Sequence, residues 1–340
     1  MKKYISLMLC ISILLLAVGC TTDKGKSGNE EAALQNPDTP VETNAAVLTD
    51  TPLPTQTPPR ADTPVPTEPQ ASTADEVQAE LPVATEAPVA PEMLHFVDVF
   101  GAPYEVEINP QVERQTYLPE CFVHDGDRLS YVGDERYRSR LGIDVSSFQG
   151  DVDWAAVKDA GIEFVIIRLG YRGYGQAGTL CLDKKFLQNI EGAQAQGLDV
   201  GVYFFAQAVN EAEAVEEAEF VLRYLEGYEL QLPVVYDPES ILDDTARTDN
   251  VTGEQFTLNT LAFCERIKEA GYEAMVYSNM LWEAYKLDLA QLSDYPIWYA
   301  DYELLPQTPY RFSFWQYTNT GRVAGIIGDV DYNIQLIPTE

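Results

Sequence analysis

Leu232-Pro233-Val234-Val235-Tyr236-Asp237-Pro238-Glu239 is the stretch that decides how this chain folds. Its apolar run predicts a strand covered on both faces, as in a parallel sheet with helices outside. Residues two apart in a strand point to the same face, so Asp237 and Glu239 are expected to project together. Pro238 cannot donate to a sheet ladder, which predicts that pairing stops here. The acids are therefore expected at a strand end, where each perturbs the ionisation of the other. Taken alone, such a pair is more often part of a solvated loop.

Strand-like and helix-like patterns alternate on both sides of this stretch. Strands are expected over residues 142–145, 163–169, 200–205, 234–236, 274–277, 297–300 and 312–317. Helices are expected over residues 183–196, 211–225 and 254–270, and a further one opens near Asp153, a candidate N-cap. This rhythm predicts a parallel sheet with helices outside, most simply a barrel. The helical pattern weakens after about residue 290, so the later helices are expected to be missing.

The predicted strand ends collect acids and aromatic rings, and in a βα barrel chemistry takes place where strands end and loops begin. These residues are Asp144, Tyr203, Asp237, Glu239, Tyr277, Trp298, Trp315, Tyr317 and Asp331. We expect a mouth of carboxylates and aromatics without basic residues, which suits a neutral sugar polymer. Glycoside cleavage needs one protonated carboxylic acid at the leaving oxygen and a second group on the opposite face of the ring.

Several motifs in this region resemble glycoside hydrolase family 25, the cell-wall lysozymes of bacteria and phages. Gly142-Ile143-Asp144-Val145-Ser146-Ser147-Phe148-Gln149-Gly150, followed by Val152-Asp153-Trp154, is similar to the opening of the family. Tyr203-Phe204, residues 233–239, Trp298-Tyr299-Ala300, Trp315-Gln316-Tyr317 and Val330-Asp331-Tyr332-Asn333 follow in the family's order. The resemblance covers about residues 140–337. It implies an irregular (β/α)5(β)3 TIM-like barrel that hydrolyses the β-1,4 bond from N-acetylmuramic acid to N-acetylglucosamine in peptidoglycan.

The resemblance also implies roles for individual residues. Glu239 matches the general acid, Asp237 the partner that orients and polarises the site, and Asp144 and Asp331 the remaining acids of the cleft. Asp329 lies close to Asp331, and either is able to point inward. The residues expected to bind substrate are Tyr203, Tyr277 and Trp298, although all three also suit the barrel core. We favour attack by the substrate's own 2-acetamido group, with Asp237 steering it, over an ordinary nucleophile.

Two other functions stay open. One is a non-catalytic cell-wall-binding lipoprotein on a glycosidase fold, although retired enzymes usually lose an acid and all four positions are filled here. The other is a glycosidase that acts on chitin or another polysaccharide. Chitinase-like counterparts have a longer acidic run on the fourth strand, which residues 234–239 do not show.

The N-terminal part of the chain has the features of an exported, tethered protein. Two lysines, an apolar stretch over residues 5–18 and then Gly19-Cys20 are typical of a secretory signal. Cys20 resembles the acylated cysteine of a bacterial lipobox, which implies cleavage before it and a lipid anchor on the outer face of the cell membrane. A plain secretory signal and an uncleaved anchor remain alternatives. Residues 21–93 hold twelve of the 21 prolines and predict a disordered, extended linker.

The predicted organisation is a signal peptide over 1–20, the linker over 21–93, a small β-rich lead-in over 94–138 and the catalytic barrel over 139–340. Within the lead-in, residues 94–100 and 104–108 predict a hairpin, and residues 122–131 predict another strand.

Composition excludes several classes of function. The net charge of −32 argues against nucleic acid, because phosphate contacts need Lys and Arg. The only histidines, His95 and His124, precede the barrel, so it holds neither a His-based metal site nor a Ser/His/Asp triad. Beyond the signal and Cys20, Cys121, Cys181 and Cys264 are an odd set without disulfide or zinc spacing. We expect a monomer without cofactor or metal that acts on peptidoglycan glycan strands.

Overall fold

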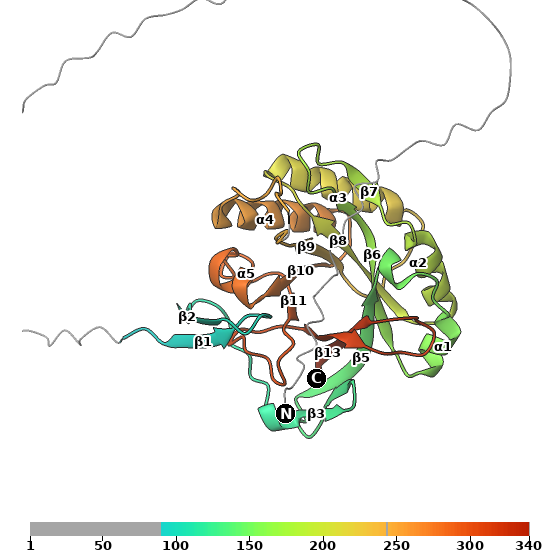
Figure 1. The fold of residues 1–340 in the computed structure, drawn as a ribbon, viewed down its shortest axis with the longest axis horizontal. Coiled ribbons are helices and arrows are strands. Elements are labelled where there is room, and N and C mark those ends of the chain that lie inside the picture. The colour runs from blue at the N-terminus through green and yellow to red at the C-terminus, as the bar shows by residue number, and fades with distance from the viewer. Residues whose placement is uncertain (1–89, 243, 340) are drawn as a thin grey trace, which may run out of the picture. The chain divides into compact units, whose positions relative to one another are not determined.

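A computed structural model describes residues 90–242 and 244–339 (Figure 1). The predicted signal peptide, the lipid-attachment residue Cys20 and nearly all of the predicted linker lie outside these residues. Within the described ranges, no helix combines the length and the apolar character needed to cross a membrane.

A closed barrel forms the body of the described chain. Its strands are β5 (Tyr137–Val145), β6 (Phe164–Arg172), β8 (Asp199–Ala206), β9 (Val234–Pro238), β10 (Ala274–Asn279), β11 (Ile297–Ala300), β12 (Phe314–Gly321) and β13 (Val330–Pro338). Each pairs with the next, and β13 pairs with β5 to close the ring. All are parallel except β13, which runs antiparallel to both neighbours. The short β7 (Leu180–Leu182) pairs with the end of β6.

Five helices follow the first five barrel strands. They are α1 (Trp154–Asp159), α2 (Phe186–Ala195), α3 (Glu211–Leu225), α4 (Gly253–Glu269) and α5 (Met280–Tyr285), and they lie outside the sheet (Figure 1). Asp153 caps α1 as expected, because its side chain accepts from the backbone N–H of Ala156 at 3.1 Å. Within the described residues no α-helix follows α5, so the predicted (β/α)5(β)3 barrel is confirmed.

The lead-in consists of two antiparallel hairpins. The first joins β1 (Met93–Val97) to β2 (Pro103–Glu107), as the sequence predicted. The second joins β3 (Phe122–Asp125) to β4 (Arg128–Tyr131), where only one strand was expected. Gly126, which has a φ of 61°, supplies the backbone conformation that this tight turn needs. Two one-turn 3-10 helices lie at Pro119–Cys121 and Ser147–Gln149.

The lead-in covers the side of the barrel that has no helices. Phe122 packs edge-on against Trp315 with ring centroids 5.3 Å apart, and Tyr117 lies 4.9 Å from the ring of Phe312. The Tyr117 hydroxyl also donates to the backbone carbonyl of Phe312. Because β11, β12 and β13 lack their own outer helices, these aromatic contacts keep their outward faces from water.

Alternation along each strand separates the barrel interior from the outer layer. Val235, Met275 and Phe314 belong to the cluster inside the barrel. Tyr236 faces outward and contacts Phe263 of α4 at 4.7 Å between ring centroids. All of β9 is buried, which confirms the expected strand with both faces covered.

Candidate active site

The barrel end at which β5 and β9 end and β13 begins carries four acids, Asp144, Asp237, Glu239 and Asp331, and is called the mouth below. Asp237 follows Val235 on the inward face of β9 and is 5% exposed. The strand ends at Pro238, as predicted, and Glu239 comes directly after it, half-buried. The two acids are therefore not part of a solvated loop.

Asp144 and Asp331 approach the mouth from opposite chain directions. They are direct partners in the antiparallel ladder between β5 and β13, and their side chains share a hydrogen bond. Asp144 Oδ2 also accepts from Gln316 Nε2 and from Asn333 Nδ2, each at 2.8 Å. Asp329, the alternative to Asp331, instead forms an ion pair with Arg322 at 2.8 Å.

These contacts give Asp144 and Asp331 different pKa values, so that the two carboxyls hold their protons unequally. Burial raises the pKa of Asp144 to about 6, and the hydrogen bonds from Asn333, Gln316 and Asp331 oppose that rise. The pKa of Asp331 is raised well above its ordinary value, by burial first and then by the neighbouring charge of Asp144. Asp331 therefore keeps its proton and donates it, and Asp144 accepts.

The second pair also titrates above the ordinary range. Burial, followed by the charges of Glu239 and Asp144, raises the pKa of Asp237 well above its usual value, and Arg168 opposes the rise. Burial raises the pKa of Glu239 to about 7; a hydrogen bond from Tyr277 lowers it and the charge of Asp144 raises it. A carboxyl with a pKa of about 7 is able to donate a proton near neutral pH.

Three aromatic side chains predicted to bind substrate lie inside the barrel near the acids. Burial raises the pKa of both tyrosines, and the charges of nearby acids add to the rise. Asp144, Asp237 and Asp331 act on Tyr203, and Glu239 acts on Tyr277. Trp298 meets both rings edge-on, with centroids 5.9 and 5.0 Å away. It is 1% exposed, and its Nε1 donates to Asn333 Oδ1 at 2.7 Å. Trp298 thus fixes the amide that holds Asp144.

Trp315 and Tyr317 do not lie at the mouth, contrary to the sequence interpretation. Trp315 packs against the lead-in, and its Nε1 donates to the carbonyl of Asp301 at 2.8 Å. The Tyr317 hydroxyl donates to the carbonyl of Asp127 at 3.0 Å. Strand alternation sends these two side chains outward and turns Gln316 between them inward. The residue of this motif that reaches the mouth is therefore Gln316, whose amide bonds to Asp144.

The expectation of a mouth without basic residues is also wrong. Arg168 continues the inward row of Phe164 and Ile166 on β6, and its charge opposes the rise of the Asp237 pKa. Its Nε donates to Asp183 Oδ2 at 2.8 Å, and its Nη2 donates to Ser147 Oγ at 3.2 Å. The sequence does hold a signal for Arg168, because side chains two residues apart on a strand share a face and Arg168 follows Phe164 and Ile166 at that spacing.

Comparison with known proteins agrees with this geometry. A family model described as glycosyl hydrolases family 25 matches residues 143–326. The chain belongs to glycosyl hydrolases family 25.

Two curated relatives are similar to the barrel region of this family 25 chain. The autolytic lysozyme of Clostridium acetobutylicum is 29% identical over 192 residues, which is 56% of this chain and 54% of that protein. Lysozyme M1 of Streptomyces globisporus is 28% identical over 213 residues, 56% of this chain and 66% of that protein. The chain therefore spans between half and two thirds of the length of these relatives.

A solved structure supports the family 25 fold. The modular autolysin LytC from Streptococcus pneumoniae, solved in complex with a synthetic peptidoglycan ligand, is 25% identical with a TM-score of 0.52. The match covers 71% of this chain and 56% of that one.

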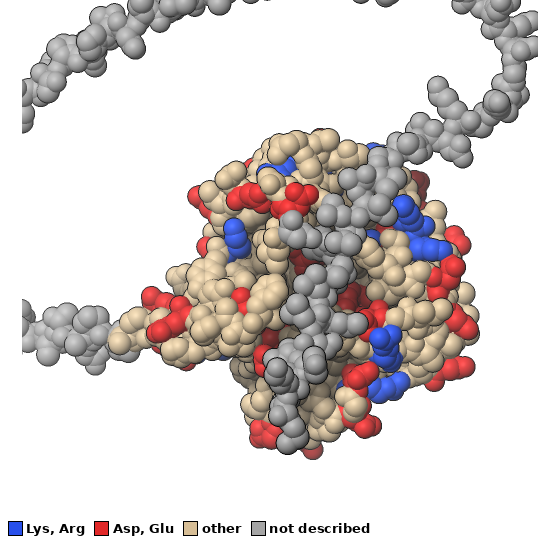
Figure 2. Space-filling model, in the orientation of Figure 1, with Lys and Arg blue, Asp and Glu red and all other residues tan. Residues whose placement is uncertain are grey.

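The described residues of this family 25 chain carry acidic side chains over much of their surface. On the face shown in Figure 2, acidic side chains of the described residues are widely spread, and basic ones gather in a few separate places. Within the described residues, His, Cys, Asp and Glu side chains form no group suited to hold a metal ion.

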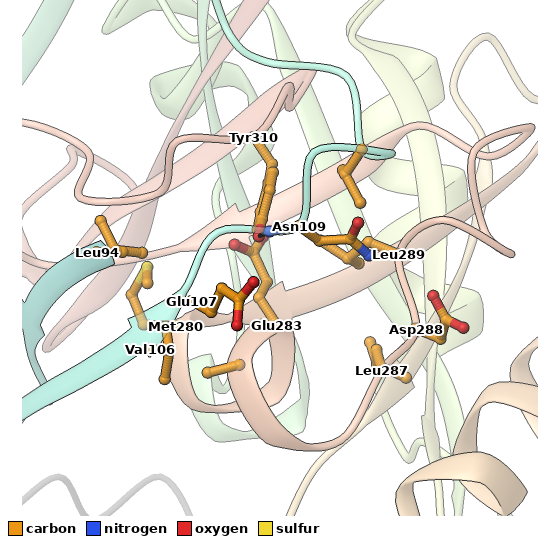
Figure 3. A pocket seen from close by; sticks show the side chains of 12 residues that line it. Leu94, Val106, Glu107, Asn109, Met280, Glu283, Leu287, Asp288, Leu289 and Tyr310 are labelled. Carbon is orange, nitrogen blue, oxygen red and sulfur yellow. Dashed lines mark hydrogen bonds between the residues drawn. The ribbon is translucent and has the colours of Figure 1, made fainter. Parts of the chain in front are cut away.

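A cavity of about 290 Å³ lies apart from the residues of the mouth, between the first hairpin and α5 (Figure 3). Leu94, Val106 and Met280 line it, together with the carboxyl of Glu283. Burial raises the pKa of Glu283 to about 8, and its Oε2 accepts from Thr308 Oγ1 at 2.5 Å. This carboxyl has a structural partner and takes no part in the mouth.

Proposed function

We propose that the chain is a peptidoglycan hydrolase, an N-acetylmuramidase that cleaves the β-1,4 bond between N-acetylmuramic acid and N-acetylglucosamine. The observation that carries the proposal is the convergence of Asp144, Asp237, Glu239 and Asp331 at one mouth, with raised pKa values throughout. The lysozyme names of two relatives and the peptidoglycan ligand of the LytC structure support the same substrate class.

Glu239 is the proton donor of the proposed reaction. Its pKa of about 7 leaves a large fraction protonated near neutral pH, and its half-buried position beyond β9 lets a glycosidic oxygen approach. The hydrogen bond from Tyr277 fixes the direction of the carboxyl. Transfer of the proton to the leaving oxygen neutralises the charge that develops there as the bond to C1 breaks.

Asp237 orients the substrate's 2-acetamido group. Its Oδ1 is buried and has no hydrogen-bond partner among the described residues, so it is available to accept the acetamido N–H. The acetamido carbonyl oxygen then bonds to C1 while the C1–O glycosidic bond breaks and Glu239 supplies the proton. Water next attacks C1, releases the acetamido oxygen and returns a proton to Glu239.

Asp144 supplies negative charge to the same site. Three hydrogen bonds favour its ionised form, and Asp331 keeps its own proton as one of the donors. A carboxylate held in place before the reaction stabilises the positive charge that develops at C1 without having to reorient.

We also propose that the enzyme works at the outer face of the cell membrane. A lipid on Cys20 would tether the chain there, and residues 21–93 would hold the catalytic barrel away from the membrane. The lipobox-like sequence and the proline-rich composition of the linker support this arrangement.

The proposal is tested by incubating the purified chain with peptidoglycan, beside a Glu239→Gln variant that keeps the size of the side chain. New muramic-acid reducing ends from the wild type alone are the expected result. Reducing ends of N-acetylglucosamine would reassign the bond, and cleavage of chitin instead would reassign the substrate. Binding to cell walls of several chemotypes without any release would show a non-catalytic wall-binding protein.

A further inference from the structure

The backbone of Glu239 is held by a side chain rather than by the sheet. The parallel ladder between β8 and β9 ends at the pair Ala206 and Pro238, so Glu239 lies beyond its last rung. Gln207, the next residue after β8, donates from Nε2 to the carbonyl oxygen of Glu239 at 2.8 Å. The glutamine amide therefore supplies one more rung after the proline has ended regular pairing.

The Gln207 side chain can adopt only one orientation in this position. A carbonyl oxygen only accepts, so Nε2 must face Glu239 and Oε1 must face the other way. There Oε1 accepts from Thr248 Oγ1 at 2.9 Å. Gln207 is 1% exposed and Thr248 is 5% exposed, so no bulk water competes for these bonds.

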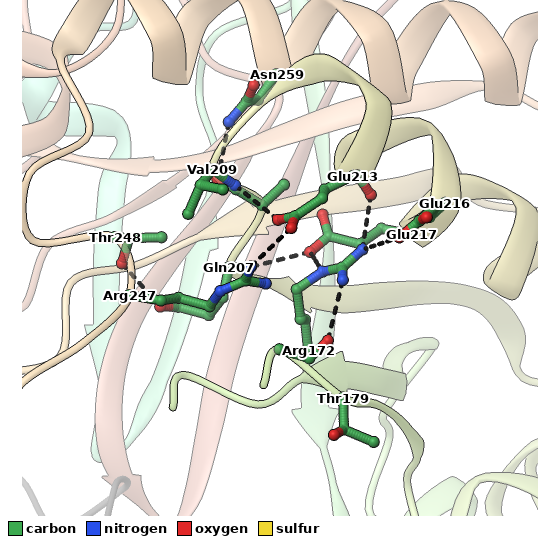
Figure 4. Close-up of polar contacts among 12 residues, drawn as sticks. Arg172, Thr179, Gln207, Val209, Glu213, Glu216, Glu217, Arg247, Thr248 and Asn259 are labelled. Carbon is green, nitrogen blue, oxygen red and sulfur yellow. Dashed lines mark hydrogen bonds and ion pairs between the residues drawn. The ribbon is translucent and has the colours of Figure 1, made fainter. Parts of the chain in front are cut away.

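The buried ion pair of Arg172 and Glu217 holds the main chain of Gln207 (Figure 4). Its N–H donates to Glu217 Oε1 at 3.1 Å, and the same oxygen accepts from Arg172 Nε at 2.8 Å. Arg172 also donates to the carbonyls of Gly178 and Glu213, at 3.0 and 2.8 Å. The segment that presents Glu239 is thus tied to β6, to α3 and to the loop that holds Thr248.

We propose that Gln207 is a positioning residue for Glu239, and that its bonds to Thr248 and Glu217 fix where the acid stands at the mouth. The inference rests on the proposed function, in which Glu239 is the proton donor. Beyond Glu239 the segment packs through Ile241, which is 7% exposed, while Leu242 is 74% exposed. The hydrogen bond from Gln207 is the contact made to the Glu239 backbone itself. Gln207 touches no reacting atom and acts through the backbone of Glu239.

The test uses Gln207→Leu, which keeps the volume of the side chain and removes both of its hydrogen bonds. We expect kcat on peptidoglycan to fall about 10- to 100-fold, the scale of a displacement near 1 Å, with KM changed less than about threefold. The descending limb of the pH profile should move to lower pH, because a Glu239 carboxyl that leaves its buried position returns toward its ordinary pKa of 4.5.

Thr248 supplies a second, milder pair of variants. Thr248→Val removes the hydroxyl at nearly constant shape and should lower kcat about 3- to 10-fold, whereas Thr248→Ser keeps the donor and should restore most of it. Tyr117→Phe, which removes a buried hydrogen bond in the lead-in, is the control for lost stability and should leave kcat and the pH profile unchanged.

A titration of the Glu239 carboxyl by carbon NMR gives a readout that needs no turnover. A lower pKa in Gln207→Leu, or in Thr248→Val if the first variant does not fold, supports the inference even if the wild type releases no glycan, an outcome that would overturn only the proposed function. The same pKa and the same pH profile in wild type and variants would overturn the inference.

Discussion

Removal of the Gln316 amide tests how the mouth keeps one acid charged among four. Gln316 is 5% exposed, and its Nε2 donates to Asp144 Oδ2 at 2.8 Å. Its Oε1 accepts from the hydroxyl of Tyr302, which is 37% exposed and can bond to water instead. Gln316→Leu therefore removes one donor to Asp144 and leaves no other buried group without a partner.

The size and sign of the effect follow from this one bond. A hydrogen bond to a charged acceptor contributes about 1.5–3 kcal/mol, and one pKa unit corresponds to about 1.4 kcal/mol, so the loss amounts to roughly 1–2 units. The donor favours the ionised form, so the pKa of Asp144 should rise from about 6 to roughly 7–8. It would then reach or pass the pKa of Glu239, which is about 7.

The consequence is a lower maximal activity, reached at a higher pH. Activity needs Asp144 ionised and Glu239 protonated, so the ascending limb of kcat/KM against pH should move up by about 1 unit, to near pH 7, and the descending limb should move up or stay but not move down. The fraction of enzyme with both groups correctly protonated at the optimum falls from roughly three fifths to between about one quarter and about one twentieth. Tyr302→Phe, which keeps the Gln316 amide, is the matched control and should leave the ascending limb in place. An unmoved limb in an active, folded Gln316→Leu enzyme would refute the assignment of Asp144 as the charged acid.

Two further predictions concern stability. Phe122→Ala should lower the free energy of unfolding, measured in urea, by about 3–5 kcal/mol, because it removes the ring that packs against Trp315. Phe100→Ala is the control. The Phe100 ring at the hairpin tip is 73% exposed, so its removal should change the free energy of unfolding by less than about 0.5 kcal/mol. Asp331→Asn should raise Tm relative to the wild type at pH 8 but not at pH 4. The pKa of Asp331 in the folded protein lies above its ordinary value of 3.8, so the folded wild type binds a proton that the unfolded chain has lost, and its stability falls as pH rises. Asparagine does not titrate, so the variant escapes this loss. Equal gains at both pH values would contradict the reasoning.

The sequence predicted well those parts of the fold that local periodicity determines. The helix expected over 211–225 is α3, and the buried strand that ends in Asp237-Pro238 is β9. It predicted less well what depends on which strand face turns inward. Trp315 and Tyr317 were expected at the mouth with the other aromatic rings, but alternation gives the inward position to the Gln316 amide between them. Arg168 was missed because residues 163–169 were interpreted as one apolar run, although every second residue from Phe164 lies on the inward face.

The residues around Asp331 were harder to predict because β13 runs against the rest of the barrel. In the parallel strands the mouth lies at the carboxyl end, so a search of strand ends finds Asp144 and Asp237. In β13 the mouth lies at the amino end, and Asp331 and Asn333 are therefore at the start of the strand. The reversal places Asp331 directly opposite Asp144 in the ladder. A parallel final strand would bring its carboxyl end to the mouth, and Asp144 would lose both the proton of Asp331 and the amide of Asn333. The antiparallel closure is therefore what supplies two of the three donors that favour a charged carboxylate in a buried, acid-rich site.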